Sequence, residues 1–124
     1  MAIEKHKLLI VDDDEAVIGY LQAKLGAHYD IVSTNVPENV LELASREQPS
    51  LILCDIDMPG MDGGDVSSAL YASEALRDIP VLFLTGLVSP ADLAGKGQQI
   101  GGRPAISKQA PLTELAKRIE SLTR

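Results

Sequence analysis

The chain has 124 residues, of which 45% are hydrophobic, and a formal net charge of −7. This length predicts one domain, residues 1–124, whose core buries roughly two thirds of the unfolded surface. The charge argues against binding to nucleic acid or to an anionic membrane surface. The apolar run 8–11 is too short for a signal peptide or a membrane span. The single cysteine, Cys54, cannot form an internal disulfide, which fits a reducing compartment. A cytoplasmic location is therefore expected.

Short apolar runs alternate with longer amphipathic stretches, which is typical of a parallel sheet covered by helices on both faces. The runs predict strands at 7–11, 30–33, 51–54, 81–84 and 104–107. A first helix is predicted at 15–25, with Asp14 capping its start and Gly26 able to take a left-handed cap at its end. Its expected buried face carries Val17, Tyr20, Leu21 and Leu25.

The later helices differ in the strength of their signals. The second is predicted to begin near Pro37, which suits a first helical turn, and the third to span about 64–76. The fourth connection, 89–102, contains four glycines, so only a short, mobile helix is expected there. The last helix follows Pro111, where apolar residues recur at helical spacing: Leu112, Leu115, Ala116, Ile119 and Leu122.

Carboxylates follow two of the predicted strands. Asp12 and Asp13 come after the first strand, and Asp55 comes after the third. If these strand ends lie side by side, the charges repel and raise one another's proton affinity unless a cation intervenes. Oxygen ligands without a neighbouring histidine or cysteine favour a hard ion, and few carboxylates with room for water favour Mg²⁺.

A hydroxyl and an ammonium end two further strands, because Thr85 closes the fourth and Lys108 follows the fifth. Either one alone is explained as a turn residue or a solvated lysine. In a doubly wound sheet, however, ligands collect at the carboxyl ends of the strands. Together with the acids, these residues form a set that handles one phosphoryl group, in which Asp55 attacks phosphorus and Lys108 and Thr85 hold two phosphoryl oxygens.

The ordered set resembles the receiver domain of bacterial two-component response regulators, chemotaxis receivers among them. Four matches along essentially the whole chain carry the resemblance: LLIVDDD at 8–14, DIDMPGMDG at 55–63, VLFLTG at 81–86, and Lys108. It implies a flavodoxin-like, doubly wound α/β fold. The implied sheet has five parallel strands in the order 2-1-3-4-5, with five helices, the fourth of them short or irregular.

The resemblance also implies a role for each site residue. Asp55 matches the phosphoacceptor, and Asp12 and Asp13 match the acidic pair that binds Mg²⁺, with the backbone carbonyl of Asp57 as a further ligand. Thr85 and Lys108 match the switch hydroxyl and the lysine. The expected phosphoryl donor is a sensor histidine kinase or a histidine phosphotransfer protein.

The expected function is that of a phosphoprotein in a two-component phosphorelay. Such a module catalyses its own acceptance and loss of phosphate and is otherwise not an enzyme. Its downstream target is an unknown protein, with no direct nucleic-acid contact and no membrane insertion. The cognate kinase, the oligomeric state and whether the chain stands alone or belongs to a longer protein stay open at this point.

Two departures from the family pattern suggest that the signal is passed on from the phosphorylation site in an altered way. Receivers commonly carry an aromatic residue where this chain has Ala105, and alanine has no ring to move. The lysine is commonly followed by proline after a cis peptide bond, whereas Gln109 follows Lys108 here. A cis bond before a residue other than proline costs about 2.5–4 kcal/mol.

Two other protein classes share part of this pattern. Asp55 and Asp57 also resemble the first motif of haloacid-dehalogenase-type phosphatases, but Pro59 follows Met58 where those enzymes have threonine or serine, and the acidic pair precedes the nucleophile. A flavodoxin-like FMN carrier needs a phosphate loop after the first strand. This chain has acids there, which would repel the phosphate.

Overall fold

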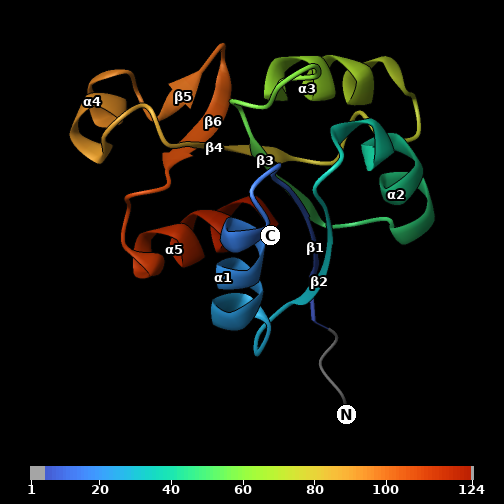
Figure 1. Cartoon of the computed structure of the whole chain (residues 1–124), viewed down its shortest axis with the longest axis horizontal. Helices are drawn as coiled ribbons and strands as arrows, with labels where there is room; N and C mark the ends of the chain where they lie inside the picture. Colours follow the sequence, from blue (N-terminus) through green and yellow to red (C-terminus); the bar gives the residue numbers. More distant parts are fainter. Residues whose placement is uncertain (1–4, 124) are drawn as a thin grey trace.

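Five parallel strands form the centre of the sheet in the computed structural model, which describes residues 5–123 (Figure 1). They are β1 (Lys7–Val11), β2 (Asp30–Thr34), β3 (Leu51–Asp55), β4 (Val81–Thr85) and β6 (Arg103–Ser107). Their order, β2-β1-β3-β4-β6, is the doubly wound order expected from the resemblance. All five residues of β3 and of β4 are buried, because helices cover both faces of a parallel sheet.

A sixth strand, β5 (Gln99–Ile100), was not expected. It pairs antiparallel with β6, where Ile100 lies opposite Arg103. Gly101 and Gly102 form the turn between the two strands with φ angles of +60° and +81°, which glycine adopts without a steric penalty. The sheet therefore ends in a short hairpin: the five predicted parallel strands are confirmed, and within residues 5–123 β5 adds a sixth, antiparallel strand.

The helices form two layers. On one face, α1 (Glu15–Leu25) and α5 (Leu112–Thr123) pack through residues such as Leu21, Leu115 and Ile119. On the other face lie α2 (Val40–Glu47), α3 (Gly63–Ala72) and α4 (Pro90–Gly95). A single 3₁₀ turn, η1 (Pro37–Asn39), leads into α2, so the second helical segment begins at the proline, as predicted. Within 5–123, no helix is long and apolar enough to cross a membrane.

Three details differ from the sequence-based expectations. On α1, Ile18 is buried while Tyr20 is 53% exposed, so the apolar face is rotated from the one predicted. Gly26 ends α1 in a right-handed conformation, with φ −64°, instead of a left-handed one. Helix α3 ends at Ala72, because Ser73 is extended, and Leu76 enters the core from the turn that follows.

Candidate functional site

Strand pairing brings the predicted site residues to one edge of the sheet. Val11 pairs with Cys54 across β1 and β3, so the next residues, Asp12 and Asp55, leave neighbouring strands at the same level. Thr85 ends β4 opposite Ser107 of β6. Lys108 follows that pair directly, so the four strand ends deliver two acids, a hydroxyl and an ammonium to one place.

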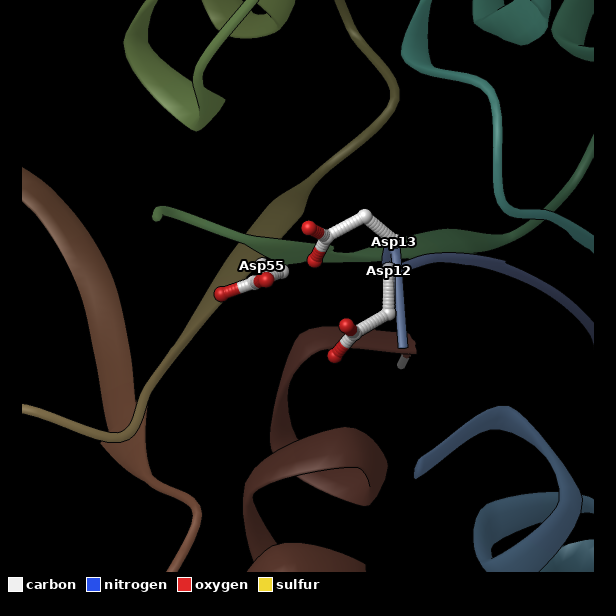
Figure 2. Close-up of side chains that lie close together, drawn as sticks. All are labelled: Asp12, Asp13 and Asp55. Carbon is white, nitrogen blue, oxygen red and sulfur yellow. The ribbon is translucent and has the colours of Figure 1, made fainter. Parts of the chain in front are cut away.

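Asp12, Asp13 and Asp55 form the acidic cluster. Each offers a carboxylate oxygen, and these three oxygens lie within 4.8 Å of one another. Asp12 and Asp55 are 0% and 2% exposed, whereas Asp13 is exposed. Figure 2 shows the side chain of Asp13 pointing toward Asp55, with the carboxylate of Asp12 below them in this view.

The cluster fits a hard divalent cation. Oδ1 of Asp12 accepts a hydrogen bond of 2.9 Å from the backbone N–H of Asp14. Its other oxygen, Oδ2, is buried and forms an ion pair of 2.9 Å with Nζ of Lys108. Lone pairs on closely spaced carboxylates are what Mg²⁺ requires, with water completing its coordination.

Lys108 lies between the two buried acids. Its Nζ is 2.9 Å from Oδ2 of Asp12 and 3.4 Å from Oδ1 of Asp55. Burial alone would lower the pKa of the lysine, but the contacts with both carboxylates outweigh this effect and raise the pKa. The ammonium therefore stays charged and compensates part of the negative charge of the cluster.

Asp55 is the acid most strongly affected by its surroundings. Burial, reinforced by the charge of Asp12, raises the pKa of Asp55 from 3.8 to about 6. A hydrogen bond of 3.1 Å from the backbone N–H of Asp57 and the charge of Lys108 act in the opposite direction without cancelling the rise. A carboxylate with this proton affinity is a better nucleophile than a solvated aspartate, provided that it is ionised.

Thr85 is linked to Lys108 through the backbone. The carbonyl oxygen of Thr85 accepts a hydrogen bond of 2.7 Å from the N–H of Lys108. The threonine side chain is 1% exposed, and its Oγ1 accepts a hydrogen bond of 3.2 Å from the N–H of Leu87. The hydroxyl hydrogen is thus free to be donated to a group arriving at the strand ends.

Two residues that sequence reasoning missed shape the loops of this site. A Cβ at Gly63 would lie 2.8 Å from Cα of Ile56 and 2.9 Å from the carbonyl oxygen of Asp55, so only glycine lets α3 begin this close to the loop that carries Asp57. Ser107 is 3% exposed, and its Oγ accepts a hydrogen bond of 3.1 Å from the N–H of Gln109. The end of the DIDMPGMDG motif at Gly63 was the available signal for the first of these contacts.

The two departures from the family pattern are also visible. Among residues 5–123 no peptide bond is cis, so the bond between Lys108 and Gln109 is trans. Ala105 is fully buried opposite Phe83 on β4, and it leaves the fifth parallel strand without a ring at this position. Cys54 is fully buried beside Asp55, and desolvation raises the pKa of its thiol to about 12, so the thiol is not a competing nucleophile.

Comparisons with known proteins agree with this geometry. Residues 8–120 match the family model of the response regulator receiver domain. The chain is 39% identical over 119 residues to the response regulator PleD of Caulobacter vibrioides, covering 95% of this chain and 26% of that protein. It spans about half the length of several other curated relatives, which are named transcriptional regulators.

Solved structures give the same result. The BeF3-activated N-terminal receiver domain of Klebsiella pneumoniae RstA is 30% identical, with a TM-score of 0.76 and coverage of 95% of this chain and 98% of that one. The chemotaxis protein CheY4 of Vibrio cholerae has a TM-score of 0.80 at 23% identity, over 96% of this chain and 99% of that one. At this low sequence identity, the comparison with CheY4 supports the fold alone.

Proposed function

The chain belongs to the response regulator receiver family, and on that premise we propose that Asp55 is its phosphoacceptor, with Asp12 and Asp13 holding Mg²⁺ beside it. The observation that carries this proposal is the single ammonium of Lys108 between the carboxylates of Asp12 and Asp55, with Asp13 adding a third negative charge nearby. One lysine leaves the cluster short of positive charge. A divalent cation would supply the remainder and neutralise charge on a phosphoryl oxygen.

The proposed transfer uses the residues of the chain in distinct roles. An oxygen of ionised Asp55 attacks phosphorus, the new O–P bond forms, and the P–N bond of the donor phosphohistidine breaks, which returns the donor to histidine. Lys108 moves from the carboxylates to a phosphoryl oxygen, and the hydroxyl of Thr85 donates a hydrogen bond to another. The backbone carbonyl of Asp57 serves as a further metal ligand in this proposal.

The donor in this account is a sensor histidine kinase or a histidine phosphotransfer protein, and the recipient of the signal is a downstream protein. Family membership decides against the haloacid-dehalogenase-type phosphatase. Receivers are signalling domains without metabolic activity. We propose that this one also loses its phosphate by self-catalysed hydrolysis, in which water attacks phosphorus and Asp55 leaves as the free carboxylate.

The test is incubation of the chain with acetyl phosphate and Mg²⁺, followed by intact-mass measurement. The expected result is the added mass of one phosphoryl group, lost on standing and absent when Mg²⁺ is removed with a chelator. The Asp55→Asn variant should keep its fold and show no added mass, because an amide is a poor nucleophile. Equal labelling of that variant would move the chemistry to another residue.

A further inference from the structure

A cleft separate from the acidic cluster opens between α3 and the β5–β6 hairpin. Its volume is about 370 Å³, which lies within the range of roughly 300–1,000 Å³ that is usual for small-molecule sites. Apolar side chains line it together with two hydroxyls and a guanidinium: Ile56, Phe83, Ile100, Ser67, Ser68 and Arg103. None of the proposed phosphoryl-site residues belongs to this lining.

The cleft lies beside the hairpin that follows the short fourth helix. Helix α4 has six residues, and the chain then returns to the sheet through the hairpin, which lies at the edge of the sheet beyond β4 (Figure 1). Gly101 at the turn lines the cleft and has no side chain to fill the space next to α3. Phe83 and Ile100 form part of the wall of this opening.

Ser67 supplies the first sign of a ligand. The residue is only 5% exposed, and within 5–123 its Oγ has no hydrogen-bond partner. A helical serine in a buried position ordinarily donates to a backbone carbonyl one turn earlier. A buried hydroxyl without a partner is costly. Ser67 belongs to the wall of the cleft, so rotation about its Cα–Cβ bond would turn the hydroxyl toward a bound molecule that completes the hydrogen bond.

Arg103 supplies the second sign. Its guanidinium lies 5.9 Å from the ring centroid of Tyr71, and the guanidinium of Arg77 lies 5.7 Å from the same centroid. No ion pair joins either arginine to a carboxylate in the described part of the chain. In a chain with a net charge of −7, two guanidiniums held on one exposed ring without a carboxylate are positioned to attract an anion.

We propose that this cleft binds a small organic acid. The carboxylate of the ligand pairs with the guanidinium of Arg103, whose planar donors match two carboxylate oxygens. The hydroxyl of Ser67, once rotated toward the cleft, donates to the same anionic group, and Ser68 lines the cleft one residue further along α3. A compact aryl or branched-alkyl body lies against Ile56, Phe83 and Ile100.

The test is a titration of the ¹⁵N-labelled chain, without Mg²⁺, with phenylacetate and separately with its neutral analogue phenylacetamide. Phenylacetate is expected to shift the amide resonances of Ser67, Ser68, Gly101 and Arg103 in a saturable way. Phenylacetamide should bind more weakly by roughly tenfold or more, because it lacks the charge that pairs with the guanidinium. Equal binding of both probes, or no saturable shift up to the solubility limit of phenylacetate, would overturn the proposal.

Variants distinguish binding in this cleft from a general electrostatic attraction of the anion to the arginines. Arg103→Gln should weaken phenylacetate binding by roughly tenfold or more, while Arg77→Gln, which changes the other arginine on the Tyr71 ring, should weaken it by less than about threefold. Ser68→Leu should block binding, because the exposed serine can be enlarged into the cleft without disturbing the core.

The matched control for the serine variant is Ser121→Leu at an exposed position of α5. It should bind phenylacetate as the parent does, and both serine variants should keep the parent's thermal transition. Similar losses for Arg103→Gln and Arg77→Gln would show a diffuse charge effect. Shifts centred on Asp55 and Lys108 would show binding at the phosphoryl site, and either result would contradict the proposed cleft.

Discussion

The ammonium of Lys108 lies 2.9 Å from Oδ2 of Asp12, a carboxylate with no exposure to solvent. Lys108 supplies the positive charge at this site, and its ammonium lies closer to Asp12 than to Asp55. Asp55 lies 3.4 Å from the same ammonium, and burial raises its pKa to about 6 despite that contact. The balance of charge among these three residues has measurable consequences for stability.

Stability should depend on pH through Asp55. Its pKa is about 6 in the folded chain against an ordinary value of 3.8, so the folded state binds the extra proton between these pH values. The contribution of Asp55 to the free energy of unfolding should therefore fall as pH rises from about 4 through 6. In Mg²⁺-free buffer, Asp55→Asn should remove this dependence and stabilise the chain near neutral pH by an amount on the order of 1–3 kcal/mol.

Urea unfolding of both proteins across this pH range measures the effect. Asp78→Asn, at an exposed aspartate outside the cluster, is the control and should follow the parent. Parallel pH profiles for the parent and Asp55→Asn would mean that burial does not disfavour the ionised form of Asp55.

Mg²⁺ should raise the melting temperature, because the cation relieves repulsion within the cluster and binds only the folded chain. Mass-action linkage gives about 2.7 kcal/mol when the free cation is at about 100 times its Kd. Asp13→Asn should reduce the gain, since it removes one of the three carboxylates. Differential scanning fluorimetry with and without millimolar Mg²⁺ measures both values, and an unchanged parent would show that the cluster is not a metal site.

The sequence predicted the strands, and the edge of the sheet where the candidate residues meet, for a physical reason. Strands buried on both faces appear as continuous apolar runs. The runs of β3 and β4 end at polar residues, Asp55 and Thr85, which mark the carboxyl edge of the sheet. The backbone pairing then places Asp12, Asp55, Thr85 and Lys108 together without any further information from the side chains.

Features that depend on packing were not predictable in the same way. A strand of two residues, β5, has no periodicity to detect, although the pair Gly101-Gly102 is a recognised hairpin signal. The exposure of Tyr20 depends on how α1 is rotated against the sheet. Apolar residues lie on more than one side of this helix, so their spacing alone did not show that Ile18 is buried instead of Tyr20. The role of Gly63 rests on a close backbone approach that the sequence alone does not show.

Leu87 should control the lifetime of the phosphorylated state. It is 81% exposed, two residues after Thr85, and its backbone N–H donates to Oγ1 of that threonine. A leucine side chain has no group that orients an attacking water, so Leu87→Asn and Leu87→Glu should each speed loss of phosphate. The decay of labelled protein after removal of acetyl phosphate measures the rate.

The control for this prediction is Leu41→Asn on α2, which changes an exposed leucine away from the strand ends. It should leave the decay rate as in the parent. If both Leu87 variants also decay at the parent's rate, Leu87 has no part in controlling access of water.

Phosphorylation should change the order of residues 89–102. Leu93 is the buried anchor of this segment, and Gly97, Gln98, Gly101 and Gly102 have positive φ angles, so regular structure has little local support. With Ala105 lacking a ring, we expect movement of Thr85 to be absorbed here. Hydrogen exchange with Mg²⁺ and beryllofluoride, which mimics the phosphorylated carboxylate, should show altered protection across the segment.

Thr85→Ala should erase much of this difference, whereas Thr113→Ala on α5 should leave it intact. Identical protection of 89–102 with and without beryllofluoride, together with changes around α5, would place the output on that helix instead.

The most direct test of the central claim identifies the labelled atom itself. An aspartyl phosphate is an acyl phosphate, and borohydride reduces it to the alcohol, which converts the labelled aspartate into homoserine. Mass mapping of the chain after treatment with acetyl phosphate, Mg²⁺ and borohydride should find homoserine at position 55 and unmodified aspartate at Asp12, Asp13 and Asp57. Homoserine at one of those three positions, or at none of the four, would contradict the assignment of Asp55 as the phosphoacceptor.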